Sequence, residues 1–341
     1  MEKKYKAMIA AAVCLVFACC IVWAMRPEPV TWKRDIFAMN TYISLAVYDQ
    51  NGGAVLDEAE RQIHEWEEHV SVTNKDSDVY RINHSGGKRV QVHADTAEVL
   101  RLALAAAGQT DGALEPTLYP VLKAWGFTTD SKQVPGEAEI QRLLKQADYR
   151  QVVLDKDTVQ LPEGMEIDLG AVGKGYASQK TAELMKKRHI TAALLNFGGN
   201  IQVIGRRPDG NPWRIGIRHP EAEEDFAVLE LEDEAAVTSG GYQNFFLGED
   251  GTVYHHILDP KTGYPARNGI LSATIIGKDG GRCDSLSTAV YVMGADKAAA
   301  FWREHRDFEM VLFTADHTVY WTEGLEGRFQ LRGAYKTEVI R

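Results

Sequence analysis

The chain has 341 residues, of which 38 are Lys or Arg and 48 are Asp or Glu, so that its formal charge is −10 at pH 7. A nucleic-acid-binding protein needs a basic face, so this acidic balance argues against nucleic acid as a partner and suits a protein that binds a divalent cation. Three of the four cysteines fall within the first twenty residues, which excludes an internal disulfide and a thiolate metal cage from the remainder of the chain.

The N-terminus has the features of an export signal. Lys3, Lys4 and Lys6 precede an apolar run over residues 7–25, which matches the basic and hydrophobic regions of such a signal. The stretch Val-Phe-Ala-Cys that ends at Cys19 is similar to a bacterial lipobox, whose Cys becomes lipidated. The alternative is an uncleaved membrane span, because the run reaches the lower edge of the ~17–25 residues that a spanning helix needs.

Either form would anchor the body of the chain in the cell membrane. Because the lysines precede the apolar run, the positive-inside rule places the body outside the cytoplasm, on the periplasmic or extracellular side. We therefore expect residues 1–25 to be a signal peptide or membrane anchor, residues 26–33 a short tether, and residues 34–335 one compact domain without internal repeats.

The first part of this domain is expected to be a strand followed by helices. Apolar and polar residues alternate over residues 36–47, which predicts a single strand with Met39 on its inner face. Asp95, with Glu98 three residues later, resembles a capping box and predicts the start of a helix. The helices expected in this part cover residues 54–70, 95–108 and 136–147, and a hairpin is expected over residues 151–161.

The second part interleaves short apolar strands irregularly with helices. This order is typical of an α+β protein with a mostly antiparallel sheet and flanking helices, and it differs from that of a doubly wound fold. The expected helices cover residues 176–188, 285–293 and 298–305, and the expected strands cover residues 191–197, 201–204, 213–218, 227–231, 235–238, 253–258, 271–276, 310–313 and 318–321.

A glycine-rich stretch at residues 167–177 joins the expected hairpin to the next helix. Gly170, Gly173 and Gly175 allow a close backbone approach, and a helix N-terminus beyond them favours an anion such as phosphate. The stretch matches neither common nucleotide loop, because Gly175 follows Lys174 where a P-loop has Ser or Thr. Without further information, a structural strand-to-helix corner is an equally good interpretation.

The sequence Asp-Leu-Gly-Ala-Val-Gly-Lys-Gly-Tyr-Ala at residues 168–177 resembles the central motif of the FAD:protein FMN transferases, the ApbE family of flavin transferases. Four further pieces are similar to that family and occur in its order, at residues 39–41, 111–117, 256–263 and 284–289. The resemblance implies an ApbE-like domain that transfers the FMN moiety of FAD, with Mg²⁺, to a Ser or Thr hydroxyl of an acceptor flavoprotein and releases AMP.

Asp284 and Thr288 are candidates for a metal site. They are four residues apart in an expected helix, so both oxygens point to the same side. Hard oxygen donors suit Mg²⁺ or Ca²⁺ rather than zinc, although for Asp284 alone a helix cap or a partner of the helix dipole is the favoured interpretation. The resemblance implies that both residues ligate the metal together with the backbone oxygen of Ala171.

The resemblance also implies the residues that contact FAD. His256 and His255 are neighbours in an expected strand, so only one can face the site, and the family pattern selects His256. A histidine there suits removal of a proton from the attacking hydroxyl, while a structural histidine remains the alternative. The remaining implied contacts are Met39, Thr117, Leu118, Tyr119, Asp168, Lys174 and Ile257, of which Tyr119 stands where the family often has Gly.

Two other functions use the same motifs. A metal-dependent FAD pyrophosphatase would direct water, in place of a hydroxyl, at the same phosphorus and yield FMN and AMP. A lipoprotein that only binds and carries flavin would have the cofactor contacts without the chemistry. Ser239 lacks His and Asp companions in the sequence, so we do not expect it to be a nucleophile.

Overall fold

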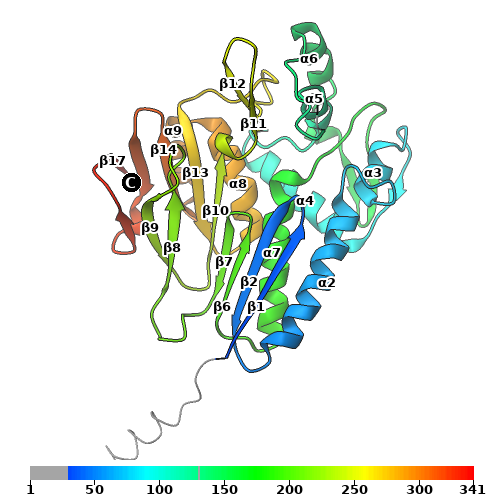
Figure 1. Cartoon of the computed structure of the whole chain (residues 1–341). Coiled ribbons are helices and arrows are strands. Elements are labelled where there is room, and N and C mark those ends of the chain that lie inside the picture. Colours follow the sequence, from blue (N-terminus) through cyan, green and yellow to red (C-terminus); the bar gives the residue numbers. More distant parts are fainter. Residues whose placement is uncertain (1–29, 130) are drawn as a thin grey trace, which may run out of the picture.

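The computed structural model describes residues 30–129 and 131–341 (Figure 1). The expected export signal at residues 1–25 therefore lies outside the described residues. Within them, none of the helices combines the length and the hydrophobicity needed to cross a bilayer.

A nine-stranded sheet forms the centre of the molecule (Figure 1). Every neighbouring pair of its strands is antiparallel except β15 and β17, which are parallel. This confirms the expected α+β class with a mostly antiparallel sheet, and the sheet extends past residues 34 and 335 at both ends. In spatial order the strands are β1 (Thr31–Ala38), β2 (Thr41–Tyr48), β6 (Ala193–Phe197), β7 (Asn200–Ile204), β10 (Ala235–Gly240), β13 (Ile270–Gly277), β14 (Glu309–Thr314), β15 (Thr318–Thr322) and β17 (Lys336–Ile340).

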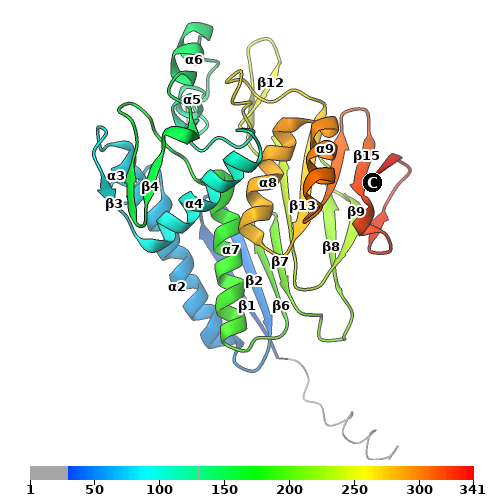
Figure 2. The same cartoon turned by 180° about the vertical axis from the view of Figure 1, so that it is seen from behind.

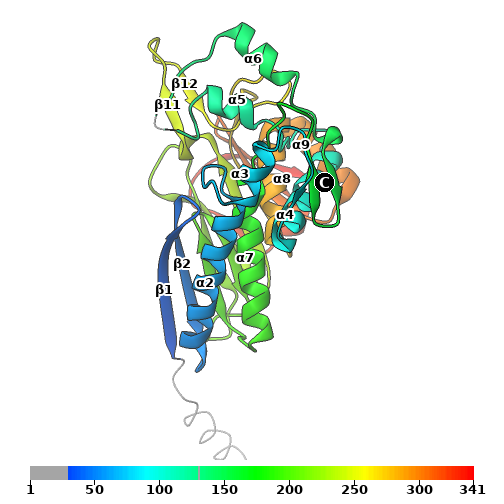
Figure 3. The same cartoon turned by 90° about the vertical axis from the view of Figure 1, so that its right-hand side faces the viewer.

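The long helices cover one face of this sheet (Figures 2 and 3). Inward residues of β2 and β6, such as Leu45 and Leu195, are fully buried against Ala59 and Ile63 of the first long helix. Burial of these apolar side chains is the main force that holds the two layers together. The helices of this layer are α2 (Gly52–Val70), α4 (Ala94–Gln109), α7 (Gly170–Lys187), α8 (Gly280–Met293) and α9 (Ala295–His305).

A second sheet covers the other face of the C-terminal strands. Phe226 and Leu229 of this sheet pack on Phe313 and Val203 of the central sheet in one buried cluster. In the C-terminal part, the central sheet is therefore the middle of three layers, with helices on one face and the three-stranded sheet on the other. The strands of this sheet are β8 (Trp213–Arg218), β9 (Asp225–Leu231) and β16 (Phe329–Leu331).

Smaller elements surround the upper end of the central sheet, as Figure 1 is drawn. Trp125 is fully buried in the cluster that contains Leu118 and Ile140, and its indole nitrogen donates to the carbonyl oxygen of Gly263 at 2.8 Å. This bond joins two segments that are far apart in the sequence. The elements of this cluster are α5 (Tyr119–Ala124), α6 (Glu137–Leu144), β11 (Phe245–Leu247) and β12 (Val253–His255). The remaining small elements lie elsewhere: α3 (Asp78–Asn83), β3 (Val90–Gln91), β4 (Val153–Asp155) and β5 (Thr158–Gln160) pack on the main core cluster, and 3-10 turns occur at Tyr149–Gln151, Gly241–Gln243 and Glu323–Leu325.

The single strand expected at residues 36–47 is wrong, because the structure has a hairpin there. Ala38 pairs with Thr41, and Met39 and Asn40 form the two-residue turn between them with φ angles of 53° and 56°. Such a turn normally has Asn-Gly, whose backbone adopts positive φ readily. Met39 lacks that preference, so the alternation of apolar residues continued through the turn without a visible break.

Three helix starts also differ from expectation. α4 begins after His93, whose backbone N–H and imidazole both bond to Asp78, so Asp95 lies within the first turn and is not the cap. α7 begins at Gly170, which places all three glycines of the glycine-rich stretch inside the helix. α8 begins after Asp279, whose carboxylate accepts from the N–H of Arg282 at 2.9 Å, so Asp284 lies within the helix and does not cap it.

Candidate active site

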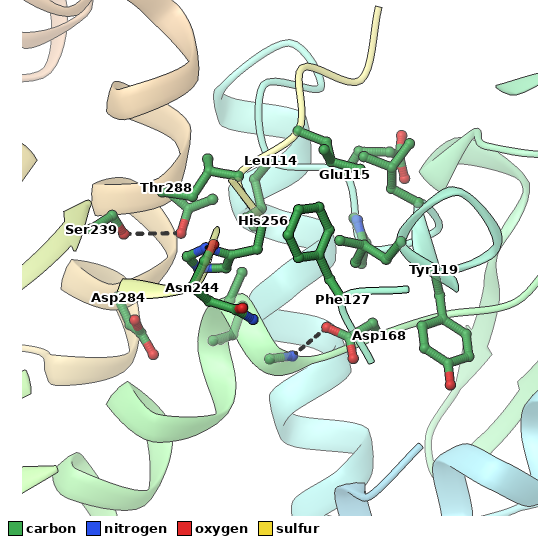
Figure 4. Close-up of a pocket in the computed structure, with 18 of the residues that line it drawn as sticks. Leu114, Glu115, Tyr119, Phe127, Asp168, Ser239, Asn244, His256, Asp284 and Thr288 are labelled. Atoms are coloured by element: carbon green, nitrogen blue, oxygen red, sulfur yellow. Dashed lines mark hydrogen bonds between the residues drawn. The ribbon is translucent and has the colours of Figure 1, made fainter. Parts of the chain in front are cut away.

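A cavity of about 330 Å³ opens beside the N-terminal ends of α7 and α8 (Figure 4). The end of β10, the segment after β12 and the segment before α5 complete its walls. Its size is at the lower end of the range for small-molecule sites. The residues expected from the sequence that line it are Leu118, Tyr119, Asp168, Ala171, Lys174, His256, Ile257, Asp284 and Thr288.

Two expected contacts, Met39 and Thr117, do not line the cavity. Met39 packs against the main core cluster, and its neighbour Asn40 in the hairpin turn faces the cavity instead. Thr117 is fully buried, and its hydroxyl donates to the carboxylate of Glu115 at 2.6 Å. Thr117 therefore orients Glu115, which does line the cavity.

Direct contact between α7 and α8 brings Ala171 close to Asp284. The N–H of Gly175 donates to the carboxylate of Asp284 at 2.7 Å. In a regular helix this N–H would bond to the carbonyl oxygen of Ala171, four residues earlier. A carbonyl oxygen has two lone pairs, so that of Ala171 can accept more than its one helical hydrogen bond, and Ala171 lines the same cavity as Asp284.

Asp284 is a buried carboxylate that needs a positive partner. Asp284 is only 4% exposed. Burial raises the pKa of its carboxyl group, while the positive charge of Lys174 lowers that pKa by a smaller amount. An ionised carboxylate is costly to bury unless it is paired or coordinates a metal. Lys174 has no ion pair among the described residues, so its charge remains available to a ligand.

The groups around Asp284 suit a hard divalent cation. Asp284 offers a carboxylate, Thr288 a hydroxyl one helical turn later, and Ala171 a carbonyl, which are the oxygen donors that Mg²⁺ prefers. No group of three or more His, Cys, Asp or Glu side chains with metal-site spacing occurs in the described part of the chain. Asp284, Thr288 and Ala171 thus fit a Mg²⁺ site with one carboxylate ligand, whose remaining positions substrate phosphates and water would fill.

His256 lies at the end of β12 with a defined tautomer. Its Nδ1 is 3.1 Å from the carbonyl oxygen of Asn244, and because a carbonyl only accepts, Nδ1 must bear the proton. Burial lowers the pKa of His256 to about 4, aided by the nearby charge of Lys174. The ring is therefore neutral at pH 7 with a free lone pair on Nε2. Its neighbour His255 lies outside this cavity and contacts the carbonyl oxygen of Ala266 at 3.2 Å.

Asp168 has a structural role and also faces the cavity. Its carboxylate accepts from the N–H of Gly170 at 2.8 Å and so holds the start of α7 (Figure 4). Burial raises the pKa of Asp168, and the charge of Lys174 lowers it. The interpretation as a turn residue and the interpretation as a ligand contact are therefore compatible.

Several cavity residues were not predicted as ligand contacts from the sequence. Asn200 is 2% exposed, and its side-chain amide lies near the carboxylate of Asp284, whose pKa it helps to lower, although its amide nitrogen makes no hydrogen bond of regular geometry within the described structure. An unsatisfied buried amide of this kind is normally completed by a ligand or water. The only available signal was its polar character at the start of an apolar strand. Asn40, Glu115 and Ser239 also line the cavity, and their contribution depends on tertiary contacts.

A family model described as the ApbE family matches residues 39–312. The chain belongs to the ApbE family. Among its relatives, an FAD:protein FMN transferase of Klebsiella pneumoniae is 31% identical over 82% of this chain and 88% of its own. One of Treponema pallidum is 30% identical over 89% of this chain and 90% of its own.

Solved ApbE structures have the same fold. The ApbE protein of Thermotoga maritima superposes with a TM-score of 0.82 at 31% identity, over 86% of this chain and 98% of its own. The flavin transferase ApbE of Vibrio cholerae gives a TM-score of 0.80 at 25% identity, over 88% of this chain and 99% of its own. The expected ApbE-like fold is therefore confirmed.

Proposed function

We propose that this protein is a Mg²⁺-dependent FAD:protein FMN transferase, which joins the FMN moiety of FAD to a Ser or Thr hydroxyl of an acceptor flavoprotein. The observation that supports this most is the convergence of Ala171, Asp284 and Thr288 on one cavity beside Lys174. Relatives that align over more than four fifths of this chain bear the name of that activity. An oxygen-donor site beside a free cation is what a dinucleotide's paired phosphates require.

The reaction exchanges one phosphate ester linkage for another. The acceptor hydroxyl oxygen forms a bond to the FMN-side phosphorus, and the bond from that phosphorus to the bridging oxygen of the pyrophosphate breaks, so that AMP leaves. Bound Mg²⁺ would polarise the phosphoryl oxygens and stabilise the negative charge that develops. Lys174 and the N-terminus of α7 add positive potential at the pyrophosphate.

The hydroxyl proton passes to a base in the cavity, for which His256 is the first candidate. Its Nδ1–H is held by Asn244, so the free lone pair of Nε2 is available to accept a proton. Asp168 is the second candidate, because burial raises its pKa and makes it a stronger base than an exposed carboxylate. Both residues line the same cavity as Asp284.

The proposal is tested with purified protein, FAD, MgCl₂ and an acceptor flavoprotein domain. We expect the intact mass of the acceptor to rise by one FMN moiety, with one AMP released for each acceptor modified. Release of free FMN and AMP at the same rate without an acceptor would instead identify a pyrophosphatase. A yellow protein that releases no AMP in MgCl₂ would identify a flavin carrier.

The pH dependence of kcat/KM tests the assignment of His256. Since its pKa is about 4, we expect His256 to stay unprotonated, and its contribution to the rate to stay constant, from pH 8 down to about pH 5.5. Substitution His256→Ala should lower kcat/KM about 10²–10⁴-fold, the usual contribution of a general base. His255→Ala is the matched control, because His255 lies outside the cavity. An unchanged kcat/KM in His256→Ala would contradict the assignment of His256 as the base.

The export signal expected at residues 1–25 would place this activity at the cell membrane, outside the cytoplasm, with acceptors on the same side. We propose that location as part of the function. Recovery of the full-length protein in the membrane fraction, with its body accessible to protease added outside the cytoplasmic membrane, would support it. Recovery in the cytosol would contradict it.

A further inference from the structure

Three hydroxyl groups form a chain from the cavity into the interface between β10 and α8. Ser239 Oγ lies 3.2 Å from Thr288 Oγ1 and 2.7 Å from Ser287 Oγ. Ser287 Oγ in turn lies 2.8 Å from the carbonyl oxygen of Asp284. Figure 4 shows the contact between Ser239 and Thr288 on the same side of the cavity as Asp284.

Only one arrangement of protons satisfies all three contacts. Each hydroxyl has a single proton to donate. The carbonyl of Asp284 can only accept, so the proton of Ser287 is used there. Ser239 must therefore donate to Ser287, and Thr288 must donate to Ser239.

The orientation of the Thr288 hydroxyl follows from this assignment. Its proton points toward Ser239, in the protein, so both lone pairs of its oxygen remain available to a ligand of the cavity that Thr288 lines. A hydroxyl that ligates a cation must present oxygen lone pairs to it, with its proton directed away to an acceptor. In the opposite orientation, the positive end of the O–H dipole would face the cation.

We infer that Ser239 is a positioning residue that fixes the Thr288 hydroxyl as a cation ligand before the metal binds, with Ser287 setting the direction of the hydroxyl chain. The inference rests on the metal role proposed above for Thr288. Ser287 is fully buried and does not line the cavity, so its influence on the metal would pass through Ser239. The chain of hydroxyl groups ends on the carbonyl oxygen of Asp284, so it also connects Thr288 to Asp284, the two proposed metal ligands on α8.

Binding of Mn²⁺, used as a probe for Mg²⁺, tests this directly. Its dissociation constant would be measured on the full-length protein by electron paramagnetic resonance of free Mn²⁺, with saturating FAD. Ser239→Ala should raise the constant about 10–100-fold, as is usual when a partner of a metal ligand is removed. Ser239→Thr, which keeps the hydroxyl, should restore affinity. Ser287→Ala lets Ser239 donate to Thr288 and should give a constant between those of wild type and Ser239→Ala.

Ser285→Ala is the matched control for a packing effect. Ser285 is fully buried on the same helix, and its hydroxyl donates to the carbonyl oxygen of Arg282 at 2.8 Å, but it has no contact with Ser239. Wild-type affinity in Ser239→Ala or Ser287→Ala would overturn the inference, as would an equal loss in Ser285→Ala. Wild-type affinity in Asp284→Asn would show instead that the proposed metal site is wrong, and the inference would fall with it.

Discussion

Replacement of Asp284 by Asn should lower the rate of FMN transfer about 10³-fold and at the same time make the metal-free protein more stable. The rate falls because loss of a preorganised charged group at a reacting phosphate removes transition-state stabilisation of that size. Stability rises because burial raises the pKa of Asp284. A carboxylate with a raised native pKa destabilises the fold increasingly as pH rises through that pKa, so at pH 7 the neutral amide is favoured.

Both effects are measured on the same samples. Transfer is followed by the mass of the acceptor, and stability by urea unfolding with and without MgCl₂. Mg²⁺ should stabilise the wild type, because a ligand that binds only the native state shifts the unfolding equilibrium, and it should not stabilise Asp284→Asn.

A second carboxylate on α8 provides the control for Asp284. Asp279 caps the helix, so Asp279→Asn should keep full transfer and the Mg²⁺ effect, since Asn also serves as an N-cap. A fully active Asp284→Asn protein would remove the metal role.

The shared helix face of Asp284 and Thr288 could be predicted from the sequence, because that prediction needed only their spacing. Four residues on one helix share a face wherever the helix begins, so the error of five residues at the start of α8 did no harm. The same holds for the α+β class with its mostly antiparallel sheet, because that prediction depends on the order of the helices and strands and not on the residues at which they begin and end. Both predictions used information that is local in the sequence.

The proximity of Ala171 to these residues is not local and could not be derived in that way. It depends on two helices whose ends are more than a hundred residues apart, and whose approach is set by Gly175 and Gly280. The family resemblance supplied the pairing, while the residues alone left a structural corner equally plausible. Asn200 escaped notice for the same reason, because a single polar residue in a strand has no periodic signature, and the place of Ser239 beside Thr288 could not be predicted either.

The turn at Met39 and Asn40 shows a different limit. A two-residue turn with positive φ at both positions reverses the chain within the alternating pattern. Only Asn-Gly or a similar pair would have marked it. The same turn directs Asn40 into the cavity in place of Met39, so a missed turn became a displaced site residue. Strained backbone of this kind is often found where a loop must meet a ligand.

Gly175→Ala should destabilise the fold and weaken metal binding together. An added Cβ would lie 2.3 Å from the carbonyl oxygen of Gly280 and 2.4 Å from Cβ of Asp284. Neither atom can move without its helix, so α7 and α8 must separate. Overpacking of this kind costs about 1–3 kcal/mol, against a gain of up to about 1 kcal/mol from the higher helix propensity of Ala.

Gly173→Ala isolates the packing contribution, since it lies two residues earlier in the same helix and its added Cβ would meet no atom within 4 Å. Gly173→Ala should benefit from the higher helix propensity of Ala without a steric clash, so the free energy of unfolding should rise by about 0.5–1 kcal/mol. Equal stabilities for the two variants would show that α7 and α8 tolerate separation. If Gly175→Ala instead folds less stably and also loses Mn²⁺ affinity, the approach of the two helices is what assembles Ala171 and Asp284 into one site.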